Sequence, residues 1–178
     1  MFPDIATGKH TIGEYITLKR GKGLVSKNAV SGEVPVVAGG LKPAFYHNKA
    51  NTTAPVITVS ASGSNVGYVQ LWSIPVWSSD SSFIDSTMTE DIYFWYVMLK
   101  KRQEEIYKMR TGSVQQHIYP KHIEILPVIE LNEKDISEFN NIVSPLFNKT
   151  GKNQLENKRL SALRDALLPK LLNEEIKI

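Results

Sequence analysis

The chain has 178 residues, of which 42% are apolar and 22% charged, a composition that suits one folded core with an appendage. It contains no cysteine, which excludes disulfides, thiolate zinc sites and a cysteine nucleophile and fits a cytoplasmic location. The 21 Lys and Arg residues against 18 Asp and Glu residues give a net charge of only +3, a mild excess for a protein that grips DNA mainly through phosphates. Because no apolar run approaches the roughly 18 residues of a membrane helix, we expect no membrane association.

Residues up to about 127 alternate short apolar runs with Gly, Pro, Asn and Ser, which is typical of short strands joined by turns. The predicted strands are residues 34–38, 56–61, 66–72 and 123–129, with turns at 39–40 and 63–67. One helix is expected to interrupt them. Thr87 and Glu90 have capping-box spacing, and apolar residues at helical spacing follow as far as residue 108. We interpret their aromatic stripe as core.

The segment from residue 9 to residue 49 is rich in bases, and its only acids are Glu14 and Glu33. Such bases suit contacts with DNA phosphates, although ordinary solvated loops would explain them equally well. The residues that we expect at phosphates are Lys19, Arg20, Lys22, Lys27 and Lys42.

A second candidate for DNA contact begins at Gly112, where a glycine turn precedes a hydroxyl, two amides and an imidazole. A glutamine can pair with adenine through two hydrogen bonds, so this segment could read base edges. The same side chains could instead satisfy backbone groups of the loop. The predicted base-reading residues are Ser113, Gln115, Gln116 and His117, with Lys42, Tyr46 and Tyr68 as weaker candidates.

From Asn132 onward the chain has a single glycine, Gly151, and its apolar residues follow a helical period. We predict a helix over about 134–172, bent near Pro145 or Gly151, which would reach about 50–60 Å if continuous. Its far end would then lie beyond its own domain, and its leucines would need a partner. The alternative is a hairpin that folds back at Gly151. The residues predicted to mediate dimerisation are Ile136, Phe139, Val143, Leu146, Leu160, Leu163, Leu167 and Leu171.

The sequence offers no convincing catalytic, cofactor or metal site. Without adjacent prolines it lacks the Asn/Asp-Pro-Pro-aromatic segment of adenine methyltransferases. The glycines at 63 and 67 form a lone loop without the third glycine of a nucleotide cradle. Glu-x-Lys at Glu156 and Glu175 is interpreted as solvated charge, and His117 and His122 lack nearby acidic or thiol ligands. We therefore expect neither an enzyme nor a bound cofactor or metal.

Taken in chain order, these segments resemble the specificity subunits of type I restriction-modification systems. Residues 32–36 with Gly39-Gly40 are similar to the opening of that family's target-recognition domain, and residues 57–60 with 63–64 and 67–69 to its central strand and turn. Trp77-Ser78-Ser79-Asp80 and Gly112-Ser113-Val114-Gln115 resemble two later segments. The end, from Leu167 to Leu172 and then Glu175-Ile176, is similar to the family's terminal helical motif. Glu174 departs from it, because the family usually has glycine there.

The resemblance implies an α+β fold with a mostly β target-recognition domain at 1–131 and a long coiled-coil-like helix at 132–178. It implies a sequence-specific DNA-binding protein without catalysis of its own, which positions double-stranded DNA for separate modification (adenine methyltransferase) and restriction (endonuclease) subunits. Full subunits of the family have two such domains and two helical regions. A natural half-subunit and an excised half therefore both remain open, and two copies could pair their arms as a homodimer.

Two other classes stay open. A protein-interaction module would use the leucine-rich arm without affinity for DNA. A small DNA-modifying enzyme would need the missing catalytic segments.

Overall fold

A four-stranded antiparallel sheet lies at the centre of the domain, in the order β2 (Lys19–Arg20), β8 (Ser81–Asp85), β5 (Val56–Ser60) and β6 (Val69–Trp72). The structure is a computed structural model that describes residues 6–173. Strands β5 and β8 are buried along their whole length, which requires cover on both faces of the sheet. Alternation along β5 supplies it: Ile57 and Val59 belong to one hydrophobic cluster, and Val56 belongs to another.

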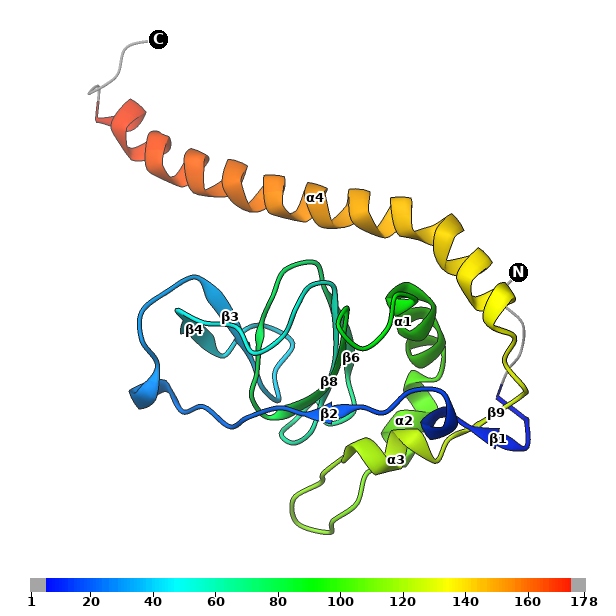
Figure 1. Ribbon diagram of the computed structural model, residues 1–178. Helices are drawn as coiled ribbons and strands as arrows, with labels where there is room; N and C mark the ends of the chain where they lie inside the picture. The colour runs from blue at the N-terminus through cyan, green and yellow to red at the C-terminus, as the bar shows by residue number, and fades with distance from the viewer. Residues whose placement is uncertain (1–5, 174–178) are drawn as a thin grey trace.

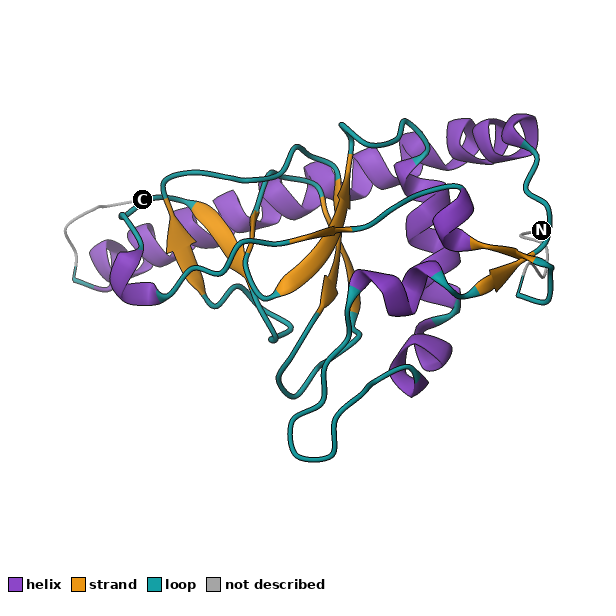
Figure 2. Ribbon diagram, turned by 60° about the horizontal axis from the view of Figure 1, so that its bottom comes forward, coloured by secondary structure: helices purple, strands orange, loops and turns teal. Residues whose placement is uncertain are grey.

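A second sheet covers one of these faces. It contains β4 (Phe45–His47), β3 (Val34–Val37) and β7 (Trp77–Ser78), with β3 and β7 parallel. Val37 and Val76 pack there against Val56 and Phe83 of the central sheet. Figure 2 shows the strands of both sheets side by side, with the longest helix running past them.

Helices α1 (Ile92–Lys101), α2 (Gln103–Lys108) and α3 (Pro120–Glu124) cover the other face. The 3-10 turns η1 (Ile12–Glu14) and η2 (Ser26–Asn28) and a small ladder of β1 (His10–Thr11) with β9 (Pro127–Val128) complete the domain. The aromatic stripe of α1 is core, as predicted, because Phe94 and Trp95 are buried in the larger cluster.

Three local expectations are wrong. The predicted helix over 92–108 is two helices, which meet at Arg102. The buried guanidinium of Arg102 donates a hydrogen bond to the carbonyl of Pro127 at 2.7 Å. Thr87 does not cap α1: its hydroxyl donates to Asp85 at 2.6 Å, and the helix begins after Asp91. Residues 123–129 are not one strand. Pro120 starts α3, which includes residues 123 and 124, and the strand β9 comes only after it, at Pro127–Val128.

The long C-terminal helix is confirmed as α4 (Glu133–Leu172), 40 residues in one element. Asn132 caps its start by accepting a hydrogen bond from the amide of Lys134 at 2.9 Å. The helix continues through Gly151, so the hairpin alternative is wrong. At about 1.5 Å per residue it spans about 60 Å. Figure 1 shows it as one curved arm passing over the domain.

None of the helices within residues 6–173 combines the length and the hydrophobicity that a membrane span requires. Glu175 and Ile176, which carry part of the resemblance, and Glu174, which departs from it, lie outside the described part of the chain.

Candidate nucleic-acid interface

Three loops come together on the side of the domain that faces away from α4. They are residues 38–44 after β3, residues 61–68 between β5 and β6, and residues 109–119 between α2 and α3. The Asn65 amide donates to the carbonyl of Gly39 at 3.3 Å, and the backbone amide of Ile118 donates to the carbonyl of Ala61 at 3.0 Å. We call this surface the loop face. In Figure 1 the loop that follows α2 extends farthest from the arm.

The segment from Thr111 to His117 has a closed base. The two residues exchange backbone hydrogen bonds of 3.0 and 2.8 Å, which form an isolated antiparallel bridge. Gly112 has φ +106°, and a Cβ at this position would lie 2.2 Å from the carbonyl oxygen of Gln115. Only glycine fits such a turn without strain. The loop is therefore a defined structure that presents the four residues between Gly112 and His117.

The predicted base-reading side chains divide into two groups. Ser113, Gln115 and Gln116 are exposed, and Gln116 accepts a long 3.4 Å hydrogen bond from Arg110. His117 is half-buried, and its ring stacks on Tyr119 with centroids 6.1 Å apart. The exposed group can meet a ligand directly, whereas the His117 ring helps to shape the base of the loop.

A polar cluster beside this loop joins the predicted residue Arg20 to Asp80 and Ser62, which were not among the predicted site residues. Asp80 accepts hydrogen bonds from Ser62 and from Arg20, the latter at 2.6 Å. The Arg20 guanidinium also lies 5.9 Å from the centroid of the Tyr119 ring. Asp80 thus partly neutralises Arg20 and holds it next to the loop. The only sequence signal for Asp80 was its place in the Trp77-Ser78-Ser79-Asp80 segment.

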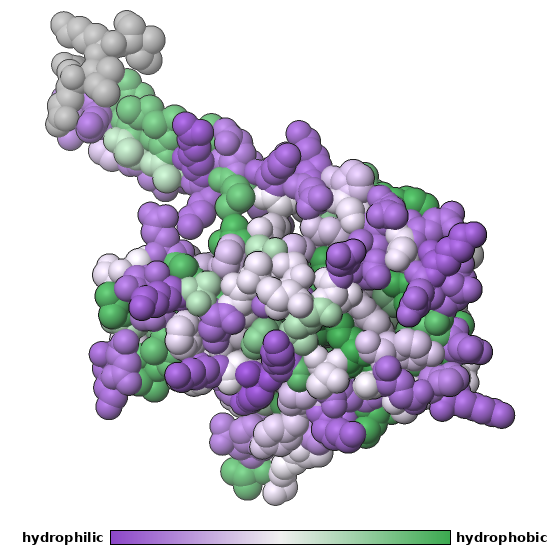
Figure 3. All heavy atoms as spheres, viewed as in Figure 1, coloured by the Kyte–Doolittle hydropathy of each residue, from purple (hydrophilic) through white to green (hydrophobic). Residues whose placement is uncertain are grey.

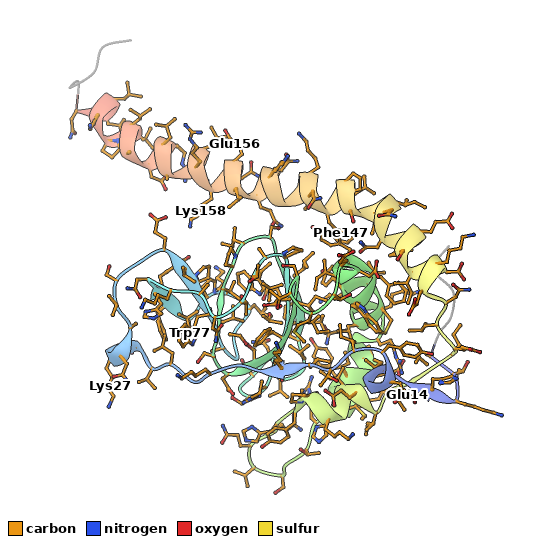
Figure 4. All side chains as sticks on the ribbon, viewed as in Figure 1. Glu14, Lys27, Trp77, Phe147, Glu156 and Lys158 are labelled. Carbon is orange, nitrogen blue, oxygen red and sulfur yellow. The ribbon has the colours of Figure 1, made fainter. Side chains whose placement is uncertain are left out.

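The remaining predicted bases lie on different parts of the domain. Lys19 is exposed beside Arg20 on β2, where successive side chains point in opposite directions. Lys42 is exposed in the first loop of the loop face. The backbone amide of Lys22 donates to Ser78 at 2.9 Å, which fixes its segment against β7. Lys27 lies in η2, at the end of the domain away from α2 and α3 (Figure 4).

The two predicted tyrosines occupy different places. Tyr46 lies on β4 under the arm, where the ammonium of Lys158 is 5.6 Å from its ring centroid. Figure 4 shows Lys158 pointing from α4 toward the domain. Tyr68 ends the β5–β6 turn, and the ammonium of Lys100 lies 4.1 Å from its ring. Tyr68 is therefore placed near the loop face, and Tyr46 is not.

The inner side of α4 is committed to its own domain. Phe147 stacks on Tyr93 at 4.9 Å between centroids, and the Tyr93 hydroxyl donates to Asn148 at 2.7 Å. Gly151 is buried against Ser73, where a Cβ would come within 2.4 Å of the serine Oγ. Two grooves, of about 320 and 220 Å³, flank this contact.

This packing corrects part of the predicted dimer surface. Ile136 is only 8% exposed, and Phe139 and Val143 pack against the same core cluster, so these three are not available to a partner. The remaining five stay exposed: Leu146, Leu160, Leu163, Leu167 and Leu171. Ile142, which sequence reasoning missed, is 65% exposed. Figure 3 shows apolar side chains gathered at the far end of the arm.

No group of three or more His, Asp or Glu side chains that could hold a metal ion occurs within residues 6–173. Burial raises the pKa of Tyr107, next to the loop, so its phenol stays neutral at ordinary pH. The loop face offers hydrogen-bond donors, acceptors and guanidinium groups on a fixed scaffold, which suits recognition of a polar surface.

No protein-family model matches the chain. It is 34% identical over 96 residues to the type I restriction enzyme MjaIX specificity subunit of Methanocaldococcus jannaschii, covering 53% of this chain and 22% of that protein. It is 32% identical over 139 residues to the type I restriction enzyme HindI specificity subunit of Haemophilus influenzae, covering 75% and 30% respectively. The crystal structure of an S subunit from M. genitalium has a TM-score of 0.70 and 26% identity, over 96% of this chain and 47% of that one. The chain thus spans less than half the length of each of these proteins.

Proposed function

Because the chain belongs to the family of type I restriction-modification specificity subunits, we propose that it reads a DNA sequence through its loop face. The observation that carries this proposal is the loop from Thr111 to His117. Its closed base, positive-φ glycine and exposed polar side chains form a reader that projects away from the arm. Residues 1–131 would then be the recognition domain and residues 132–178 the arm.

Base readout falls to Ser113, Gln115 and Gln116. The amides of the two glutamines can each pair with the N6 and N7 edge of adenine in the major groove. Among the described residues no hydrogen bond to the protein holds the side chains of Ser113 or Gln115, which supports readout over a purely structural role.

Phosphate contacts fall to the exposed bases nearest this loop. Lys42 is exposed in the first loop of the loop face, Lys19 is exposed on β2, and Arg20 adds a guanidinium held by Asp80. Lys22 and Lys27 belong to a longer path that would reach flanking DNA. Such contacts position a duplex without selecting its sequence.

The chain itself would do no chemistry. It would hold its target for a modification subunit that methylates adenine and a restriction subunit that cleaves, as the family resemblance implies. A protein-interaction module that uses only the arm is the competing function, and it predicts no affinity for duplex DNA.

Selection from randomised duplexes, with and without the modification subunit, tests the proposal. A recovered consensus is the expected result. Gln116→Ala should then relax the consensus at one position without lowering stability, and Lys42→Glu should weaken binding to all sequences with a shallower salt dependence. A wild-type chain that enriches no sequence under either condition would contradict the proposed function.

We further propose a homodimer held by antiparallel arms. At about 100° per residue, Ile142, Leu163 and Leu167 lie about 140–160° around the helix from Phe147, which faces the domain. These residues therefore lie on the outer side of α4, away from the domain. Figure 4 shows Glu156 on this outer side and Phe147 and Lys158 on the inner side, which faces the domain. An unpaired apolar stripe of this length would favour aggregation.

The spacing also suggests a register. Ile142, Lys149, Glu156 and Leu163 follow each other at intervals of seven, as do Leu146, Asn153, Leu160 and Leu167. Antiparallel pairing then sets Leu146 opposite Leu163 of the second copy and Ile142 opposite its Leu167. The recognition domains would lie at opposite ends, as a bipartite target requires.

Sedimentation tests the dimer. We expect twice the chain mass of 20.0 kDa, and Leu163→Glu with Leu167→Glu should halve it. Leu172→Glu is the matched control, because Leu172 is 76% exposed yet lies on the inner side of the helix, about 20° from the direction of Phe147. A monodisperse monomer at micromolar concentration would refute the dimer and leave the DNA-reading proposal standing.

A further inference from the structure

The loop from Thr111 to His117 carries an apolar side chain at its exposed tip. Val114 is 99% exposed, and its neighbours Ser113, Gln115 and Gln116 are exposed and polar. A single exposed valine on a protein surface needs no explanation by itself. The position of Val114 does need one, because this residue occupies the part of the loop face that a bound duplex would meet first.

The structure holds this tip in place. Below it, Thr111 and His117 close the loop with two backbone hydrogen bonds, and Gly112 sets the turn with its positive φ. Ile118, the next residue, is completely buried and bonded through its amide to Ala61 beside the central sheet. Valine adds stiffness of its own, because branching at Cβ restricts its side-chain rotation. A loop anchored in this way presents two methyl groups at a fixed point.

We propose that Val114 contacts the C5-methyl group of a thymine in the major groove and so selects thymine at one position of the target. This inference rests on the proposed function. The thymine methyl is the apolar feature that distinguishes base edges in the major groove. The adjacent glutamines suit adenine, so this loop would read a segment that contains A·T pairs.

The chemistry of the residue argues against a different apolar contact. Side chains that wedge between base pairs are long or bulky, such as Phe, Leu, Ile, Met or Pro, and they act from the minor groove. Valine is short and branched close to the backbone. It can cover a methyl group but cannot reach into the base stack.

A double-mutant cycle between protein and DNA tests the inference. In the duplex recovered by selection, each thymine is replaced in turn by deoxyuridine, which removes only the C5-methyl group. We expect one replacement to weaken wild-type binding about fourfold, equivalent to about 0.8 kcal/mol for a buried methyl group. Val114→Ala should be insensitive to that replacement. Because Val114 is almost fully exposed, its removal should leave the thermal unfolding temperature unchanged.

Val30→Ala is the matched control, since Val30 is also an exposed valine (56%) but lies outside the loop face. This variant should keep the full effect of deoxyuridine. The inference is overturned if Val114→Ala responds to every replacement as the wild type does, or if no thymine methyl matters to the wild type. Both outcomes leave a selected duplex in hand, and so differ from failure of the proposed function, in which no sequence is enriched.

Discussion

Asn140 joins the arm to the domain, and its replacement should lower the free energy of unfolding substantially. This residue of α4 is 7% exposed, and its Oδ1 accepts hydrogen bonds from the backbone amides of Tyr93 and Phe94 at 3.1 and 3.4 Å. Its Nδ2 donates to the carbonyl of Glu90 at 3.2 Å. The N-cap residue Asp91 makes no side-chain capping bond, so α4 caps α1 from outside the helix.

Asn140→Ala would leave two buried amides and one carbonyl without these partners. Unsatisfied buried groups cost about 1–3 kcal/mol and a lost cap about 1 kcal/mol, and the two estimates overlap. We therefore expect a loss of about 2–3 kcal/mol in unfolding free energy, which lowers Tm by about 4–12 °C in a chain of this size.

Urea denaturation followed by tryptophan fluorescence measures this loss, because Trp95 of α1 is buried beside the contact. Asn141→Ala is the control: Asn141 is exposed on the same helix and shares the change in helix propensity. If the Asn140 and Asn141 variants are equally stable, the capping role assigned to Asn140 is wrong.

Three further predictions concern single positions. Gly112→Ala strains the φ +106° turn, so the loop should rearrange and affinity for the selected duplex should fall about tenfold or more. Gly23→Ala, whose methyl meets nothing within 4 Å among the described residues, should bind normally. Gly151→Ala should lower the unfolding free energy in the wild type but raise it by about 1 kcal/mol in a Ser73→Gly background, where only helix propensity acts. A change of the same sign in both backgrounds would refute the close contact. Burial, reinforced by Glu90, raises the pKa of Asp91, so folding disfavours its charged form. Stability is therefore lost as the pH rises through the pKa that Asp91 has in the folded chain. At neutral pH the Asp91→Asn variant should be more stable than the wild type. Denaturation below about pH 4 should show no difference in its favour.

The central sheet and the arm could be predicted because their signals are local. The apolar run of β5 reports a strand, and the glycine-poor stretch after Asn132 reports a helix. The hairpin alternative failed because nothing at Gly151 ends the helix: the glycine is there for the approach of Ser73.

The site was harder to predict because its parts meet only in three dimensions. The Arg20–Asp80 pair joins residues that are 60 apart in the sequence, and no periodic pattern of residues predicts such a contact. Ile136 and Ile142 are both apolar positions of α4, but only packing decides that the first is buried and the second exposed. Tyr46 lies beneath Lys158 for the same reason, since the course of the arm over β4 is a tertiary feature.

The most direct test of the account is the ratio of affinities for two duplexes of equal length and composition, measured at physiological salt with the modification subunit present. One carries the sequence recovered by selection and the other a permutation of it. Sequence reading through the loop face predicts that the first binds about 10³-fold or more tightly, the range of specific DNA-binding proteins. Equal affinities for the two duplexes would contradict the claim that this chain reads DNA.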